Sequence, residues 1–303
     1  MSTPSDAAGL GLALGCSVLF GLYMAPRKMC AMGSMPFLLT MVIGVVITLS
    51  IIFAATGRTF EAAGTDVALS VSCGTLWTLG TLFFVLGVTR MGLATSTTIK
   101  NTTAVWGALV GIVLFNEGAQ TDSATCVAGS VLIAGSAGCL GATGDGKGAA
   151  ASISIPGVVY SLLASLAYAG YTVPLKVVRG HGVSFVETVF YMGLGAAVTG
   201  LAIFAACDRR FGAWWRRPPR DHAWAAISGV LWSLAVLTMT EAIEVVGLAV
   251  TWPIANLNTV FAIALGVWVF HEVDLKRHGR LLSLGVGMAV AGVALLGLSR
   301  TLR

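Results

Sequence analysis

The sequence predicts an all-α integral membrane protein whose ten transmembrane helices form two inverted repeats of five helices each. Apolar residues make up 56% of the 303 residues and charged residues only 10%, whereas a soluble domain carries about 25% charged residues. Ten apolar stretches approach the roughly 20 residues that a helix needs to cross a bilayer. Apolar sequence from the first half of the chain also recurs in the second half.

Each expected span is an apolar segment bounded by polar or glycine-containing turns. Most connections are short, so consecutive helices are expected to pack antiparallel. The longest connection, 208–221, carries five arginines. The expected spans are 9–26, 35–56, 67–89, 92–115, 123–141, 153–174, 184–206, 222–243, 246–270 and 280–298.

The internal repeat has an offset of 155 residues: Gly92-Leu93-Ala94 recurs as Gly247-Leu248-Ala249, and Asn101 recurs as Asn256. Because five is an odd number, the second copy enters the membrane from the opposite side, as in inverted-repeat transporters. We expect a first repeat over 1–141, a glycine-rich linker over 142–152 and a second repeat over 153–303. A weaker match at an offset of 148 pairs Tyr23, Pro26 and Lys28 with Tyr171, Pro174 and Lys176.

Composition and spacing argue against several other classes of protein. The six cysteines form no CxxC pair and the four histidines lack zinc-ligand spacing, so neither a metal nor a cofactor is expected. The net charge of +5 is scattered, without the interleaved aromatics of a nucleic-acid-binding patch. The stretch from Gly141 to Lys147 fits GxxxxGK, but no strand precedes it, and Gly148 replaces the Ser or Thr of a P-loop. A flexible linker is the better interpretation.

Two five-helix halves, each with a Gly-Leu-Ala opening and an Asn-Glu or His-Glu ending on its fourth helix, resemble the drug/metabolite transporter superfamily with paired EamA-type repeats. The stretches from Phe20 to Lys28 and from Tyr168 to Lys176 are most similar to its sugar-porter branch, the rhamnose- and glucose-type uptake carriers. The resemblance implies a substrate site near the middle of the membrane, lined by both halves, and alternating access. It also implies cytoplasmic termini, whereas the distribution of Lys and Arg predicts external termini. The orientation stays open.

Lys100 is the sharpest candidate for a functional side chain. It follows Gly92 by eight residues, which places it about 12 Å into the membrane at 1.5 Å per residue, near the midplane of a core about 30 Å thick. Its repeat partner is Ala255, so the repeated fold does not require the charge. Ionisable residues at such depth mark solute pathways. We expect a substrate contact or a gating ion pair; a structural pair with a carboxylate is the alternative.

Four aromatic residues extend the predicted substrate site. Trp77 and Trp232 are repeat partners that each lie ten residues into a helix, far from the interfacial belt where Trp is enriched. Their faces can stack on a sugar ring, and core packing is the alternative. Tyr23 and Tyr171 precede prolines at the ends of the first and sixth spans, where proline can break or end a helix.

Three amides and three carboxylates complete the candidates. Asn101, Asn256 and Asn258 are intramembrane amides, which suit vicinal hydroxyls because they donate and accept hydrogen bonds. They serve equally well to join neighbouring helices. Glu187, near the start of the seventh span, has Leu39 as its repeat partner. Glu187, Glu241 and Glu244 are all candidates to carry a coupling proton, and Glu187 is the best of them; solvation at the membrane interface is the alternative.

These residues predict a secondary active transporter rather than an enzyme, since no His, Asp or Ser/Lys constellation sits at catalytic spacing within a helix. The expected solute is a small polar organic molecule, a sugar or polyol, moved by alternating access with a proton or sodium as coupling ion. The alternative is a carrier or exporter of anionic metabolites, amino acids or drugs that uses Lys100 as the substrate counter-ion. We expect a multi-pass protein of the inner or plasma membrane, in contact with lipid, and leave a homodimer open.

Overall fold

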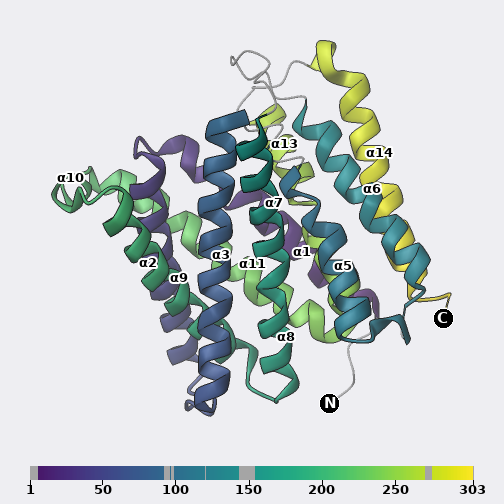
Figure 1. Ribbon diagram of the computed structural model, residues 1–303, viewed down its shortest axis with the longest axis horizontal. Coiled ribbons are helices and arrows are strands. Elements are labelled where there is room, and N and C mark those ends of the chain that lie inside the picture. Colours follow the sequence, from purple (N-terminus) through teal and green to yellow (C-terminus); the bar gives the residue numbers. More distant parts are fainter. Residues whose placement is uncertain are drawn as a thin grey trace.

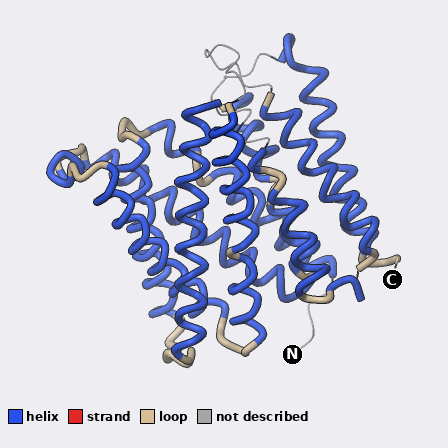
Figure 2. The backbone as a smooth tube through the Cα atoms, in the orientation of Figure 1, coloured by secondary structure: helices blue, strands red, loops and turns tan. Residues whose placement is uncertain are grey.

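The computed structural model is a bundle of α-helices and describes residues 6–91, 96, 99–119, 121–142, 154–269 and 275–302. Figure 2 shows these helices joined by short loops, with no strand in the described part of the chain. Eight helical segments of that part are long and apolar enough to cross a membrane: Asp6–Arg27, Ser34–Ala55, Gly64–Gly87, Ser123–Leu140, Ile155–Gly180, Phe185–Cys207, Pro219–Val246 and His278–Ser299.

The helix starts follow local sequence signals. The side chains of Asp122, Ser154 and Ser184 each accept a hydrogen bond from a backbone N–H in the first turn of the helix that follows. In chain order the elements are α1 (Asp6–Leu22), η1 (Ala25–Met29), α2 (Ser34–Ala55), α3 (Gly64–Met91), α5 (Thr103–Leu114), η2 (Glu117–Ala119), α6 (Ser123–Gly141), α7 (Ile155–Gly170), α8 (Thr172–Gly180), α9 (Phe185–Cys207), α10 (Phe211–Trp215), α11 (Pro219–Val246), α12 (Leu248–Ala255), α13 (Asn258–Trp268) and α14 (Leu275–Ser299).

Two of the ten expected spans, 92–115 and 246–270, are not among these eight segments of the described residues. The expected span 246–270 divides into α12 and α13, with a turn at Asn256 and Leu257. Pro253 lies inside α12, where its ring removes one backbone donor. The expected span 92–115 is represented by α5, and most of its first half lies outside the described residues. The same holds for most of the expected linker 142–152, so the ten-helix count stays a prediction.

The two halves of the chain interdigitate. The most extensive helix contacts join α3 to α7 and α9, α2 to α9 and α11, α1 to α11, α5 to α12, and α6 to α14. In each of these pairs, one helix precedes the expected linker and the other follows it. Figure 1 shows the last pair, α6 and α14, side by side at one edge of the bundle. Contacts between the halves therefore build most of the core.

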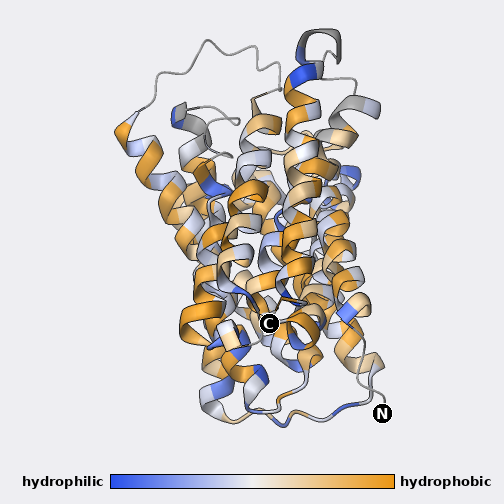
Figure 3. Ribbon diagram, turned by 90° about the vertical axis from the view of Figure 1, so that its right-hand side faces the viewer, coloured by the Kyte–Doolittle hydropathy of each residue, from blue (hydrophilic) through white to orange (hydrophobic). Residues whose placement is uncertain are grey.

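Hydrophobic residues, orange in Figure 3, occur along most of the height of the helices. Large side chains such as Ile51, Val198 and Val290 are more than 60% exposed, which suits lipid rather than water. At one end Arg300 pairs with Asp6 at 3.3 Å, so both ends of the described chain share one face, which we call the terminus face (Figure 1). The protein is a multi-pass membrane protein.

Candidate functional site

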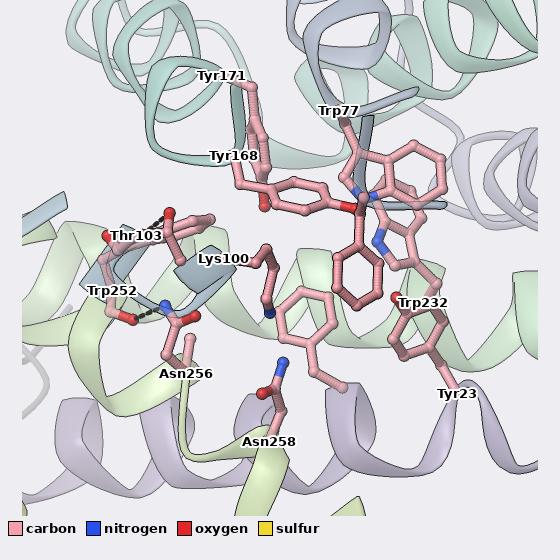
Figure 4. A pocket seen from close by; sticks show the side chains of 13 residues that line it. Tyr23, Trp77, Lys100, Thr103, Tyr168, Tyr171, Trp232, Trp252, Asn256 and Asn258 are labelled. Carbon is pink, nitrogen blue, oxygen red and sulfur yellow. Dashed lines mark hydrogen bonds between the residues drawn. The ribbon is translucent and has the colours of Figure 1, made fainter. Parts of the chain in front are cut away.

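A cavity of about 90 Å³ lies inside the bundle, where helices of both halves meet (Figure 4). Seven of the eight predicted substrate-binding residues line it, and Asn101 does not. Its full lining is Phe20, Tyr23, Trp77, Phe84, Lys100, Thr103, Tyr168, Tyr171, Trp232, Trp252, Ala255, Asn256 and Asn258.

The cavity lies where four helical segments are interrupted. Turns occur at Tyr23, at Asn101-Thr102, at Tyr171 and at Asn256-Leu257, and each turn includes or directly adjoins a cavity residue. Non-helical backbone at membrane depth is tolerated only where it is buried in protein or lines a polar cavity, because lipid offers no hydrogen-bond partners. The interruptions therefore coincide with a polar cavity, as in transporters with discontinuous helices.

The two predicted tryptophans contact each other. The ring centroids of Trp77 and Trp232 are 4.3 Å apart and their planes are inclined by 38°. This contact leaves no space for a sugar ring between the two indoles, so the expected stacking on opposed faces is restricted to surfaces turned toward the cavity. Neither indole N–H has a hydrogen-bond partner among the described residues, although both side chains line the cavity. The pair thus offers two donors to a solute.

Lys100 extends into the cavity without a carboxylate partner. Its Nζ lies 5.8 Å from the ring centroid of Phe84 and 5.8 Å from that of Tyr168, a distance at which aromatic faces attract a cation. Within the described part of the chain, no Asp or Glu forms an ion pair with it. Within the described residues, the structure therefore supports neither a gating ion pair nor a structural ion pair of Lys100 with a carboxylate. Its ammonium faces the cavity.

Hydrogen bonds fix the cavity wall formed by α5 and α12. Trp252 Nε1 donates to the carbonyl oxygen of Thr103 at 2.9 Å. Asn256 Nδ2 donates to the carbonyl oxygen of Trp252 at 2.8 Å, as the dashed lines in Figure 4 show. Asn256 Oδ1 keeps its acceptor capacity for the cavity. Tyr171 packs edge-to-face on Trp252, with centroids 5.3 Å apart and an angle of 83°.

Two predicted functional residues lie away from the cavity lining. Asn101 Nδ2 donates to Thr259 Oγ1 at 3.0 Å, so this amide joins the segment before α5 to α13. Glu187 is 1% exposed, and its Oε1 accepts the backbone N–H of Glu61 at 3.0 Å and of Ala62 at 2.9 Å. Its carboxylate therefore anchors the loop between α2 and α3, and its role in ion coupling stays a prediction.

The sequence repeat identifies some cavity residues that were not among the predicted site residues. Tyr168 is the repeat partner of Phe20 at the offset of 148, and Thr103 is the partner of Asn258 at the offset of 155. Both pairs line the cavity, as do the partner pairs Tyr23/Tyr171, Trp77/Trp232 and Lys100/Ala255. Four of these five pairs include a predicted site residue. The members of the fifth pair, Phe20 and Tyr168, begin the two stretches that resemble the sugar-porter branch. Phe84 gave no such signal, because its partner is Met239, which lies outside the lining.

A second polar cluster, which no sequence pattern predicted, lies at the terminus face, and we call it the Glu117 clamp. Glu117 Oε1 accepts the backbone N–H of Leu248 at 2.9 Å, and Oε2 accepts that of Ala249 at 2.7 Å. The ammonium of Lys176 pairs with the same carboxylate. Gly247 adopts a φ of +82°, which L side chains rarely adopt. One carboxylate thus joins the end of α5 to the start of α12 and to α8.

The backbone leaves room for this clamp. A Cβ atom at Gly111 would lie 2.6 Å from the nitrogen of Ala249 and 2.7 Å from Glu117 Oε2. The clamp binds α12 three residues before Trp252, which lines the cavity. Glu272 and Lys28 are the repeat partners of Glu117 and Lys176, and their side chains lie outside the described part of the structure. The repeat places Glu117 and Glu272 at equivalent positions but does not reveal which groups Glu117 binds.

Comparisons with known proteins cover most of the chain. A family model described as "Sugar transport protein" matches residues 5–143 and 139–299. The chain is 23% identical over 248 residues to "Putative sugar uptake protein lin0215" of Listeria innocua and 22% identical over 248 residues to "Putative sugar uptake protein lmo0176" of Listeria monocytogenes. Each alignment covers 77% of this chain and 79% of the relative.

Two further similarities are partial or concern the fold alone. A segment of 82 residues is 32% identical to "Probable 4-amino-4-deoxy-L-arabinose-phosphoundecaprenol flippase subunit ArnE" of an Enterobacter species, covering 27% of this chain and 73% of that protein. A solved structure, described only as the crystal structure of a protein, superposes with a TM-score of 0.75 at 15% identity. That match covers 98% of this chain and 99% of the other.

Proposed function

Because this chain is a membrane transporter that belongs to the sugar transport protein family, we propose that it is a secondary active transporter of a monosaccharide-sized sugar or polyol. The observation that carries the proposal is the aromatic and polar cavity at the interrupted helices. Small-molecule sites combine apolar and aromatic walls with a few placed polar groups. Indole and phenol faces match the C–H faces of a sugar, while amides and hydroxyls match its hydroxyl groups.

The proposed mechanism is alternating access between two inverted repeats. Five pairs of repeat partners line the cavity, which supports a site on the axis that relates the two halves. The family model matches each half separately, at 5–143 and 139–299, which supports a duplicated unit. The ends of the described chain share one face through Asp6 and Arg300, in agreement with an even number of spans.

The size of the cavity supports a closed state. At about 90 Å³ it is smaller than the roughly 300–1,000 Å³ of small-molecule pockets, so a monosaccharide requires the lining helices to move apart. In this mechanism the Glu117 clamp holds the terminus face closed, because it ties α5, α8 and α12 together beside Trp252. Release of the clamp opens the cavity toward that face.

The coupling ion is proposed to be a proton or sodium. Glu187 remains the proposed proton carrier from sequence, although its carboxylate is engaged with the loop between α2 and α3. Proton-driven and sodium-driven uptake are separated by imposing each gradient alone on proteoliposomes. Accumulation of labelled sugar under one gradient identifies the ion.

Binding of sugars to the purified protein tests the proposal. We expect thermal stabilisation by at least one of glucose, rhamnose, ribose or a polyol, and loss of that stabilisation in Trp232→Ala. The matched control is Trp268→Ala, because Trp268 is 75% exposed on the outer surface of α13. Stabilisation that survives in Trp232→Ala, or that disappears equally in Trp268→Ala, contradicts the assignment of the site.

A further inference from the structure

Lys100 places a positive charge in the proposed sugar site without a counter-ion from the described residues. Its Nζ lies 5.8 Å from the ring centroid of Phe84 and 5.8 Å from that of Tyr168. These rings hold the ammonium by cation–π attraction but accept no conventional hydrogen bond. An ammonium has three N–H donors and no acceptor. The donors of Lys100 are therefore left for whatever occupies the cavity.

Among the other polar side chains of the described lining, the indoles can only donate, while the amides and hydroxyls can both donate and accept. Trp77 and Trp232 offer N–H groups that can only donate. Asn256 contributes its carbonyl oxygen and one N–H, since its other N–H is bound to the carbonyl of Trp252. Asn258 also lines the cavity, and its Oδ1 already accepts the hydroxyl of Thr259 at 3.3 Å. Tyr23 and Tyr171 carry hydroxyls that can donate or accept. No carboxylate belongs to the described lining.

A cavity with one ammonium, two donor-only indoles and no carboxylate in its described lining fits a solute with one negative charge. A neutral sugar has hydroxyls that donate and accept in equal measure, so it leaves the charge of Lys100 unmatched. A carboxylate supplies acceptor lone pairs and a single charge, and its hydrogen bonds to an ammonium are about twice as strong as neutral ones.

We propose that the solute is an acidic monosaccharide, a sugar-sized polyol that carries one carboxylate, with the carboxylate bound by Lys100. This inference rests on the proposed function and narrows its substrate class. In the proposed complex the carboxylate meets Lys100, while the hydroxyls meet the indole donors and Asn256. A phosphate ester presents about −1.5 to −2 charges at neutral pH, more than the single ammonium of the described lining can match.

Paired ligands that differ only in the acidic group test the inference. Binding is measured by thermal shift and by tryptophan fluorescence with glucose, glucuronate and glucose 6-phosphate, at one ionic strength. We expect the wild type to bind glucuronate at least about tenfold more tightly than glucose, because a hydrogen bond to a charged group contributes more than a neutral one. Glucose 6-phosphate is expected to bind less tightly than glucuronate.

Variants of Lys100 then test whether this side chain causes the preference for glucuronate over glucose. Lys100→Gln should lose at least about tenfold in glucuronate affinity, and it should lose more affinity for glucuronate than for glucose, so that the wild-type preference for glucuronate disappears. Lys100→Arg keeps the charge and should keep the preference for glucuronate. If Lys100→Gln does not fold, the wild-type ratio of glucuronate affinity to glucose affinity still tests the inference.

Each other outcome overturns a defined statement. Tighter wild-type binding of glucose than of glucuronate, or full retention of glucuronate affinity in Lys100→Gln, overturns the acidic-sugar inference and leaves sugar transport in place. Tighter binding of glucose 6-phosphate than of glucuronate overturns the inference that the acidic group of the solute is a carboxylate. Absence of binding by any neutral or acidic sugar overturns the proposed function as well.

Discussion

Replacement of Glu117 by glutamine should destabilise the protein strongly, because Glu117 is the acceptor at the centre of the clamp. Its side chain is 7% exposed and that of Lys176 is 22% exposed. The amide keeps one acceptor oxygen for either Leu248 or Ala249, turns a donor toward the other N–H, and leaves Lys176 without its partner. Breaking a buried pair by removing one partner costs about 3–5 kcal/mol.

The expected loss is about 3 kcal/mol for Glu117→Gln, at the low end of that range because Lys176 is partly exposed. In domains of 150–250 residues 1 kcal/mol shifts the melting temperature by about 2–4 °C, so we expect a shift of roughly 6–12 °C. Thermal unfolding in detergent, followed by circular dichroism, measures it. Lys176→Gln should cost less, because the Glu117 carboxylate then keeps both backbone donors.

Glu244→Gln is the matched control on the same face. Glu244 lies 3.4 Å from Arg179, and the side chains of Glu244 and Arg179 are 38% and 16% exposed. Because solvent screens the Glu244 carboxylate, the pair should contribute about 1 kcal/mol or less. Equal melting temperatures for Glu117→Gln and Glu244→Gln would refute the clamp as a stabilising element. A larger loss for Lys176→Gln than for Glu117→Gln would contradict the role given to the two backbone hydrogen bonds.

Three further predictions concern packing, the predicted proton carrier and accessibility. Gly107→Ala should lower the melting temperature, because a Cβ atom there overlaps the indole of Trp252, and overpacking costs about 1–3 kcal/mol; Gly287→Ala, with no neighbour within 4 Å, should not. Glu187→Gln should stay near wild-type stability, since one oxygen accepts both backbone N–H groups, whereas Glu187→Ala should unfold earlier; loss of proton-driven uptake in folded Glu187→Gln would support the coupling role. Cys207 is the exposed cysteine of the six, so a maleimide should label it first, and equal labelling of Cys207→Ala and wild type would contradict this.

Hydropathy and the internal repeat predicted the all-helical membrane fold and most of the cavity. A long apolar segment predicts a membrane-spanning helix, because unpaired backbone N–H and C=O groups are costly in lipid and a helix pairs them within one segment. The repeat predicted the pairs Tyr23/Tyr171 and Trp77/Trp232, since equivalent positions of two interlocked copies meet at the same depth. Lys100 was predicted by the cost of its charge at that depth, and the structure places it in the cavity lining.

Other features depend on contacts between segments distant in sequence. Asn101 and Asn256 are equivalent in the repeat, yet only Asn256 lines the cavity, because Asn101 is bound to Thr259 on α13. The contact between Trp77 and Trp232 could likewise not be predicted from the sequence. The repeat pattern predicts the depth of each side chain in the membrane but not the direction in which it points.

What the sequence alone determined was the membrane class, since it depends on local hydropathy. The depth of the polar residues and their division between two repeated copies stay predictions from spacing. Which donors remain open to a solute was decided by the tertiary structure. A side chain such as Glu117 or Glu187 acquires its partners only when helices from the two halves pack. Hydrogen bonds form between groups that are close in space. For residues that are far apart in the sequence, this proximity is known only from the folded structure.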